Sequence, residues 1–116
     1  MKIKKGQIYI ADLDGVTGSE QGGTRPVLVI QNNMGNKHSP TTIVACITTK
    51  LNNKAHLPTH CYLPNELGLE ARSIVMLEQI RTIDKTRLHT YVGKLSSRYI
   101  NIIDKKIAIS LDLKRK

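Results

Sequence analysis

Two side chains with complementary chemistry stand at the ends of two apolar runs. Arg25 comes directly before Pro26 and the run 27–30, and Thr48 comes directly after the run 42–47. Arginine offers five N–H donors in a planar fork that matches phosphate oxygens, and threonine adds a short, stiff hydroxyl. If the two runs are neighbouring antiparallel strands, both side chains can reach one phosphate and stabilise a pentacoordinate phosphorane. The pair therefore predicts a site that cleaves a phosphodiester.

The loop before Arg25 is rich in glycine and polar residues. Gly18, Gly22 and Gly23 can adopt backbone angles closed to other residues and allow a ligand to approach the main chain. Between them the loop carries a hydroxyl, a carboxylate and an amide, on Ser19, Glu20 and Gln21. Because Pro26 pushes Arg25 toward an extended conformation, the guanidinium is expected at the rim of a rigid sheet, beneath this loop. The alternative is structural: Arg25 pairs with Glu20, and Thr48 caps a turn.

The histidines and cysteines predict no further chemistry. A ribonuclease with two histidines needs one imidazole to take the ribose 2′-OH proton and another to protonate the leaving oxygen. The four histidines, His38, His56, His60 and His89, are scattered, and we interpret each as a surface or packing residue. Cys46 and Cys61 have no CxxC partner, which argues against a zinc site, and Cys46 is expected in the core.

Length and charge limit the function classes. The chain has 116 residues, which predicts a single domain over residues 1–116 that buries roughly 65% of its unfolded surface. Lysine and arginine number 18 against 9 aspartates and glutamates, a formal charge of +9, which indicates either a polyanionic partner or simply a solvated basic surface. With no Trp or Phe and only 4 Tyr, a single-strand binder that relies on aromatic stacking is disfavoured.

The sequence contains no P-loop, GxGxxG, HExxH or GxSxG motif, so nucleotide hydrolysis, dinucleotide binding and the familiar hydrolase mechanisms lack support, and we expect no cofactor. The N-terminal apolar segment is too short and too interrupted for a signal peptide or membrane span, so we expect a cytoplasmic protein with no membrane partner.

The elements that must position these residues are mainly strands. Alternating or continuous apolar patterns predict strands over 6–11, 27–31, 42–47, 57–63, 73–83 and 91–95, the fifth of them either one long strand or two joined by a bend. The polar segment 32–40 is a connection with room for one helical turn, and 64–68 predicts a single helical turn. From Ser97 the period changes, and Ile100, Ile103, Ile107 and Leu111 form one apolar stripe on a terminal helix capped by Ser96 or Ser97. The fold class is mainly β with α: a small, bent sheet or barrel with a helix packed on it.

Several segments resemble the MazF/PemK family of toxin endoribonucleases, most of all its members from Gram-positive bacteria. These are GSEQGGTRPVLVIQN (18–32), TIVACIT (42–48), LPTH (57–60) and LEQIRTID (77–84). The resemblance covers nearly the whole chain in one register, and its first and last motifs are highly specific.

The resemblance implies a small SH3-like barrel of the PemK/CcdB type that forms a homodimer. It also implies metal- and ribosome-independent cleavage of single-stranded RNA at a short sequence, leaving a 2′,3′-cyclic phosphate and a 5′-hydroxyl. The expected partners are mRNA and an antitoxin of the MazE type whose C-terminal tail covers the RNA groove.

The resemblance also assigns residues. Its catalytic arginine and threonine fall on Arg25 and Thr48. The implied substrate-binding residues are Ser19, Gln21, Thr49, Glu78 and Gln79, of which Glu78 and Gln79 are expected to contact bases. A guanidinium holds its proton too tightly to act as a base in water, so we expect Arg25 to clamp the phosphate and protonate the leaving oxygen. Glu20 is the candidate acceptor for the 2′-OH proton, with orientation of Arg25 as its competing role.

Two other functions stay open at this stage. The gyrase inhibitor CcdB shares the implied fold without being a nuclease, and such a poison depends on its C-terminal residues rather than on the loop with Arg25. The third option is a basic module that binds RNA without cutting it, to which the tail Lys114-Arg115-Lys116 would add affinity. For the nuclease, similarity favours a pentanucleotide site containing ACA.

Overall fold

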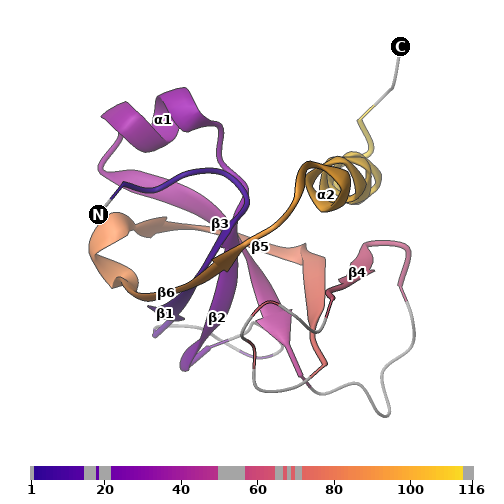
Figure 1. Cartoon of the computed structure of the whole chain (residues 1–116), viewed down its shortest axis with the longest axis horizontal. Helices are drawn as coiled ribbons and strands as arrows, with labels where there is room; N and C mark the ends of the chain where they lie inside the picture. Colours follow the sequence, from indigo (N-terminus) through magenta and orange to yellow (C-terminus); the bar gives the residue numbers. More distant parts are fainter. Residues whose placement is uncertain are drawn as a thin grey trace.

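A computed structural model describes residues 2–14, 18, 22–49, 57–64, 67, 69 and 72–113 (Figure 1). The strands in this part of the chain are β1 (Gln7–Asp12), β2 (Thr24–Val29), β3 (Thr41–Thr48), β4 (His60–Tyr62), β5 (Ile74–Asp84) and β6 (Leu88–Lys94). The helices are α1 (Asn33–His38) and α2 (Ser97–Ser110), and the 3₁₀ turn η2 (Lys85–Arg87) joins β5 to β6. The predicted fold class, mainly β with a C-terminal helix, is confirmed.

All six strands belong to one sheet in the order β4-β5-β3-β2-β1-β6, and every neighbouring pair is antiparallel. The long strand β5 pairs with β3 along its length and with the short β4 near its start. Helix α2 packs against β4 and β5, on the side of the sheet opposite α1 in the view of Figure 1.

The sheet buries apolar residues on both faces. In β3, Val44 and Cys46 enter one core cluster while Ala45 and Ile47 enter the other, as the two-residue period of a strand requires. The first cluster, which we call the inner core, is built from the strands and Ile3; the second, the outer core, includes Ile103 of α2. This double burial explains why the central strands are continuous apolar runs in the sequence rather than alternating ones.

Helix α2 begins where the sequence predicts. The Ser96 hydroxyl accepts a hydrogen bond from the backbone N–H of Tyr99 at 3.5 Å, and Ile103 is 1% exposed. The predicted stripe is wrong at its last member, because Leu111 is 57% exposed. The helix ends at Ser110, and Asp112 then adopts a positive φ of 53°, which turns the chain before another helical turn can pack.

Other boundaries differ for local reasons. The strand predicted over 57–63 is limited to β4, because a turn that includes Pro58 precedes it, closed by a hydrogen bond from the His60 N–H to the Leu57 carbonyl. The connection 32–40 holds α1, capped by the Asn32 side chain, which accepts from the N–H of Gly35. Strand β5 is one strand rather than two. Most of the predicted turn at 64–68 lies outside the described residues.

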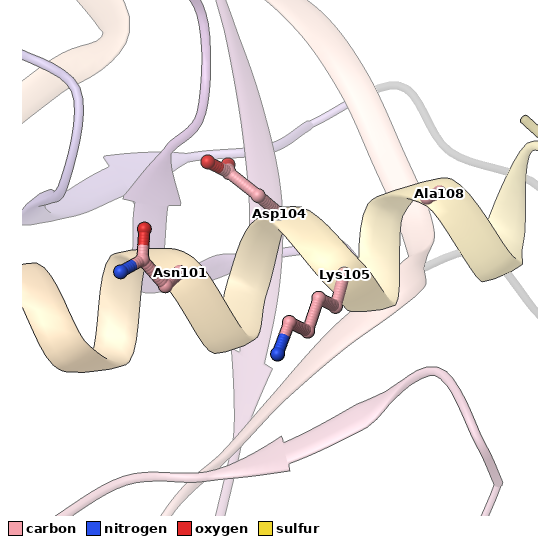
Figure 2. Close-up of a pocket in the computed structure, with 4 residues that line it drawn as sticks. All are labelled: Asn101, Asp104, Lys105 and Ala108. Carbon is pink, nitrogen blue, oxygen red and sulfur yellow. The ribbon is translucent and has the colours of Figure 1, made fainter. Parts of the chain in front are cut away.

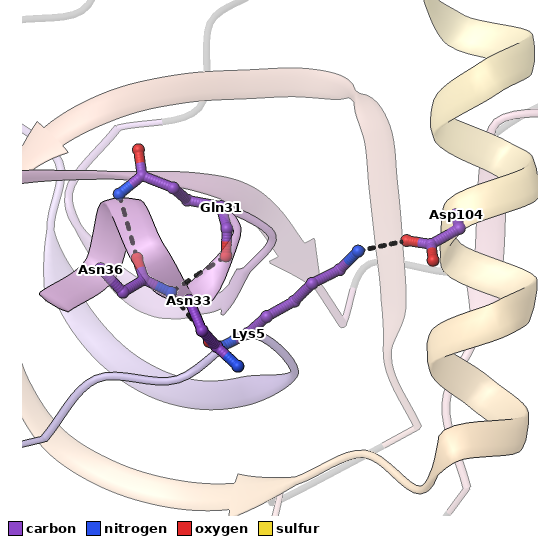
Figure 3. A network of polar contacts seen from close by, with 5 residues as sticks. All are labelled: Lys5, Gln31, Asn33, Asn36 and Asp104. Carbon is purple, nitrogen blue, oxygen red and sulfur yellow. Dashed lines mark hydrogen bonds and ion pairs between the residues drawn. The ribbon is translucent and has the colours of Figure 1, made fainter.

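Polar contacts tie the N-terminal segment to both helices (Figure 3). The Lys5 ammonium forms an ion pair with Asp104 of α2 at 2.7 Å, and its backbone N–H donates to the Asn33 side chain of α1. Asn36 is 3% exposed, and its amide donates to the Gln31 carbonyl at 2.9 Å while its oxygen accepts from the Gln31 amide. This network is structural and keeps α1 on the end of the sheet.

Candidate active site

The antiparallel pairing expected of the two apolar runs is present. Strand β2 pairs with β3 so that Val27 lies opposite Cys46. Extended by two residues beyond this pair, the same register would set Arg25 opposite Thr48. Neighbouring strands lie about 4.8 Å apart, close enough for a guanidinium and a hydroxyl to grip one phosphate group.

Strand periodicity also sets the face on which the pair lies. Val27 and Cys46 belong to the inner core, so Arg25 and Thr48, two residues away, face the same side of the sheet. Thr48 is 8% exposed, while Arg25 at the sheet rim is partly buried. The two residues of the predicted pair therefore lie at neighbouring ends of β2 and β3, beside the inner core.

Arg25 is fixed by the loop that precedes it. Its Nε donates to the carbonyl of Gly22 at 2.9 Å. Gly23, between them, has φ +74°, a conformation that a residue with a Cβ adopts only with strain. Ser19, Glu20 and Gln21 lie outside the described residues, so their predicted roles remain predictions.

Two more arginines donate hydrogen bonds to the backbone at residues 12 and 13, just before that loop. Arg81 of β5 donates through Nη1 to the carbonyl of Leu13 at 3.2 Å, and Arg87 of η2 donates to the carbonyl of Asp12 at 3.2 Å. The region around the loop ends is therefore strongly cationic, which suits a polyanion.

Cys46 lies beneath this cationic region and is not a nucleophile. Burial raises the pKa of the Cys46 thiol, and the positive charges of Arg25 and Arg81 offset only part of that effect. A buried, neutral thiol is a packing group. The predicted core role of Cys46 is confirmed, at 1% exposure.

Glu78 and Gln79 lie in an irregularity of β5. Ala45 of β3 pairs with Ile80, but the next residue, Cys46, pairs with Met76, so the segment between them bulges out of the ladder with β3. Bulges change the direction of side chains, and this one takes Glu78 and Gln79, the two predicted base-contacting residues, out of regular pairing with β3. Thr49, the remaining predicted contact, is exposed directly after β3.

The Glu78 carboxylate is held by two residues that precede or begin β4. Oε1 accepts from the Thr59 hydroxyl at 2.6 Å, and Oε2 lies 3.0 Å from Nε2 of His60. Partial burial raises the pKa of Glu78, but the hydrogen bonds from Thr59, from its own backbone and from His60 outweigh it, and the pKa is lowered. The sequence gives no sign of this contact, because strand periodicity cannot show which side chains cross from one strand to the next.

Tyr62 is a second residue that sequence reasoning missed. It pairs with Ile74 of β5, which pairs in turn with Thr48, so all three lie in one row on the inner-core face. Its side chain is 41% exposed.

Two hollows lie on α2 and the residues that follow it. Figure 2 shows one of about 360 Å³ lined by Asn101, Asp104, Lys105 and Ala108, all on α2, and none of the predicted site residues lines it. The candidate site is instead formed at the ends of two central strands, β2 and β3, which suits an extended polymer better than a small molecule. Within the described ranges, no three His, Cys, Asp or Glu side chains are grouped to hold a metal ion, and no helix is long and apolar enough to span a membrane.

Comparison with known proteins gives matches over almost the whole chain. The model of the family described as PemK-like, MazF-like toxins of type II toxin-antitoxin systems matches residues 4–111. A protein of Bacillus subtilis (strain 168) named Endoribonuclease EndoA is 51% identical over 114 residues, 97% of each chain.

Solved structures share the fold. A mycobacterial endoribonuclease in complex with its cognate antitoxin is 25% identical with a TM-score of 0.81, covering 98% of this chain and 99% of that one. MazF from Deinococcus radiodurans has a TM-score of 0.84 at 20% identity, covering 97% and 99%, and shows likeness of fold.

Proposed function

The chain belongs to the PemK-like, MazF-like toxins of type II toxin-antitoxin systems. We therefore propose that it is a toxin endoribonuclease that cleaves single-stranded RNA, with Arg25 and Thr48 as its catalytic residues. The observation that carries this proposal is the β2–β3 register, which aligns the start of one strand with the end of the other on one face. The cationic surroundings of the loop ends support a polyanionic substrate.

The reaction we propose is a transesterification within the RNA. The 2′-oxygen attacks the neighbouring phosphorus, the bond from phosphorus to the 5′-oxygen breaks, and the products are a 2′,3′-cyclic phosphate and a 5′-hydroxyl. Arg25 holds the non-bridging oxygens and gives a proton to the departing 5′-oxygen, while Thr48 donates to the phosphorane. Glu20 takes the 2′-OH proton, and exchange with solvent restores both side chains. No step in this scheme uses a metal or the ribosome.

Recognition falls to the loop and the bulge. Ser19 and Gln21 contact the RNA from the loop, Thr49 from the end of β3, and Glu78 and Gln79 contact bases. We further propose that residues 1–116 act as one domain in the cytoplasm, that two copies form a homodimer, and that a MazE-type antitoxin silences it. The antitoxin complex of a relative with the same fold supports the last point.

The test is cleavage of a long mixed-sequence RNA by the purified protein in EDTA. We expect discrete fragments with 5′-hydroxyl ends, which polynucleotide kinase labels without phosphatase treatment, and a site that end mapping resolves to a short sequence such as an ACA-containing pentanucleotide.

Arg25→Ala should leave the RNA intact. Uncut RNA with the wild-type protein would exclude the nuclease. Inhibition of DNA supercoiling by gyrase in the same preparation would then identify a gyrase poison, and RNA binding without cutting would identify a binding module.

A further inference from the structure

We infer that His60 is a positioning residue for base recognition: its Nε2 fixes the Glu78 carboxylate so that it accepts a hydrogen bond from the exocyclic amine of an unstacked adenine or cytosine. The inference rests on the proposed function, because it assigns a specificity role within the same RNA site.

The contact joins two strands at the bulge. His60 opens β4, and its Nε2 lies 3.0 Å from Oε2 of Glu78, while Thr59 donates to the other oxygen at 2.6 Å. With both oxygens held from one side, the carboxylate has one defined orientation, although Glu78 lies where β5 leaves its ladder with β3. The Glu78 side chain stays 30% exposed, so a ligand can reach it.

The burial of His60 leaves Nε2 to make its polar contact. His60 is 9% exposed, and within the described part of the chain its Nδ1 is buried with no hydrogen-bond partner. Nε2 lies 3.0 Å from Oε2 of Glu78, and a ring that carries a proton on Nε2 donates to that oxygen. The contact therefore orients the carboxylate from the β4 side.

An ionised, oriented carboxylate discriminates between bases. Each of its oxygens has a second lone pair after the contacts with Thr59 and His60, and it can only accept hydrogen bonds. Adenine N6 and cytosine N4 donate, whereas guanine O6 and uracil O4 occupy the corresponding position and only accept, so they are repelled there. Guanine N1–H and N2–H₂ donate from another part of the base edge. A base placed with the N6 or N4 position toward Glu78 is therefore selected as adenine or cytosine.

The place of His60 in the sheet separates this role from the chemical step. His60 pairs with Met76 of β5, and Met76 pairs with Cys46 of β3. His60 is therefore two strands across from Cys46, and Thr48 lies two residues further along β3 on the same face. Ideal sheet spacings put their Cα atoms roughly 12 Å apart. That is too far to share the scissile phosphate, and it suits a neighbouring nucleotide.

The test uses two matched amides. In His60→Gln the side-chain amide reaches the position of Nε2, whereas in His60→Asn it ends near Nδ1 and cannot donate to Glu78. RNA oligonucleotides that differ at one position of the cleavage site are compared for wild type, both variants, Glu78→Gln and the double variant His60→Asn/Glu78→Gln.

We expect wild type to prefer adenine or cytosine at one position by about tenfold or more, the range for a good base contact. His60→Asn should lose most of that preference through KM, with the single-turnover rate at saturating RNA unchanged, and His60→Gln should keep it. In the Glu78→Gln background, His60→Asn should add no further loss.

A second readout needs no RNA. Acid titration of the Glu78 carboxyl carbon by NMR should give a higher pKa in His60→Asn than in wild type, because both the hydrogen bond from His60 and its electrostatic attraction lower the pKa of Glu78.

An unchanged base preference in His60→Asn, or an equal loss with and without Glu78, would overturn the inference, as would an unchanged Glu78 titration. Failure of the wild type to cut any RNA would instead overturn the proposed nuclease, so the two failures are distinguishable.

Discussion

Thr48→Val gives the sharpest test of the candidate site at the ends of β2 and β3, because valine keeps the shape of threonine and removes only the hydroxyl. Thr48 ends β3 at 8% exposure, and valine is at least as well suited to a strand. Thr48 has interactions of its own in the fold, and the loss of one hydroxyl contact costs about 1 kcal/mol of stability. The rate is therefore measured at a temperature where the variant is folded, so that a large loss of activity can be assigned to chemistry.

The expected magnitude follows from the position of Thr48. Extending the β2–β3 register by two residues would set Thr48 beside Arg25 of the neighbouring strand, about 4.8 Å away. In the proposed mechanism both side chains contact the same phosphate. Removing one donor that is aimed at developing charge typically costs 10²–10³ in rate, about 2.7–4 kcal/mol. Thr48→Ser keeps the donor and loses only the stiffness that the methyl group gives to χ1, so it should stay within about tenfold of wild type.

The assay is single-turnover cleavage of a saturating, end-labelled RNA in EDTA. Thr42→Val is the matched control: Thr42 lies on the same strand and face, is 0% exposed, and donates to Asn36 at 2.7 Å. That variant should lose about 1 kcal/mol of stability while its cleavage rate at a temperature where it is folded stays unchanged. If Thr48→Val retains more than about a tenth of the wild-type rate, well above the range for a lost transition-state donor, the hydroxyl does not act on the phosphorane.

Three further outcomes follow from the contacts. Arg25→Lys should lower kcat/KM about a hundredfold without unfolding, because a single ammonium cannot donate to Gly22 and fork two phosphate oxygens; full activity would contradict the clamp. Cys46 should resist iodoacetamide at neutral pH in the folded protein and react after denaturation, by mass spectrometry, because burial raises the pKa of its thiol. The hydrogen bonds that lower the pKa of Glu78 give stability that is present above its usual value of 4.5 and is lost as pH falls through the lower folded-state value. Thermal scans between pH ~5 and ~3 should therefore show a smaller loss of Tm for Glu78→Gln than for wild type; equal losses would contradict this.

The sequence predicts the strands well because the sheet is buried on both faces. Continuous apolar runs such as 42–47 leave few alternatives to a central strand, and the change to a helical period after Ser97 is unambiguous. Predictions fail where short-range contacts decide the outcome. The turn that includes Pro58 shortens β4, and the Asn32 cap extends the helical turn predicted within 32–40 to the six residues of α1.

The residues of the candidate site likewise fall into those that the sequence predicts and those that it does not. Arg25 and Thr48 are predictable, because a residue that begins one strand and a residue that ends the next must share an edge if the strands are antiparallel. The partners of Glu78 are not predictable, because they depend on a bulge in β5 that appears only when its register with β3 is known. No local pattern marks it, since the apolar residues on either side of the bulge fit one continuous strand.

The two kinds of position correspond to two physical demands. Catalysis needs donors held rigidly where charge develops, and the Arg25–Thr48 row adjoins the pair Val27–Cys46, which is packed in the inner core. Recognition of a base needs an accessible side chain that still has a fixed orientation. A bulge supplies the access, and contacts from the adjacent strand restore the orientation that regular pairing would have given. A small chain can therefore cut RNA selectively if the rigid part of its sheet holds the phosphate and the irregular part contacts the base.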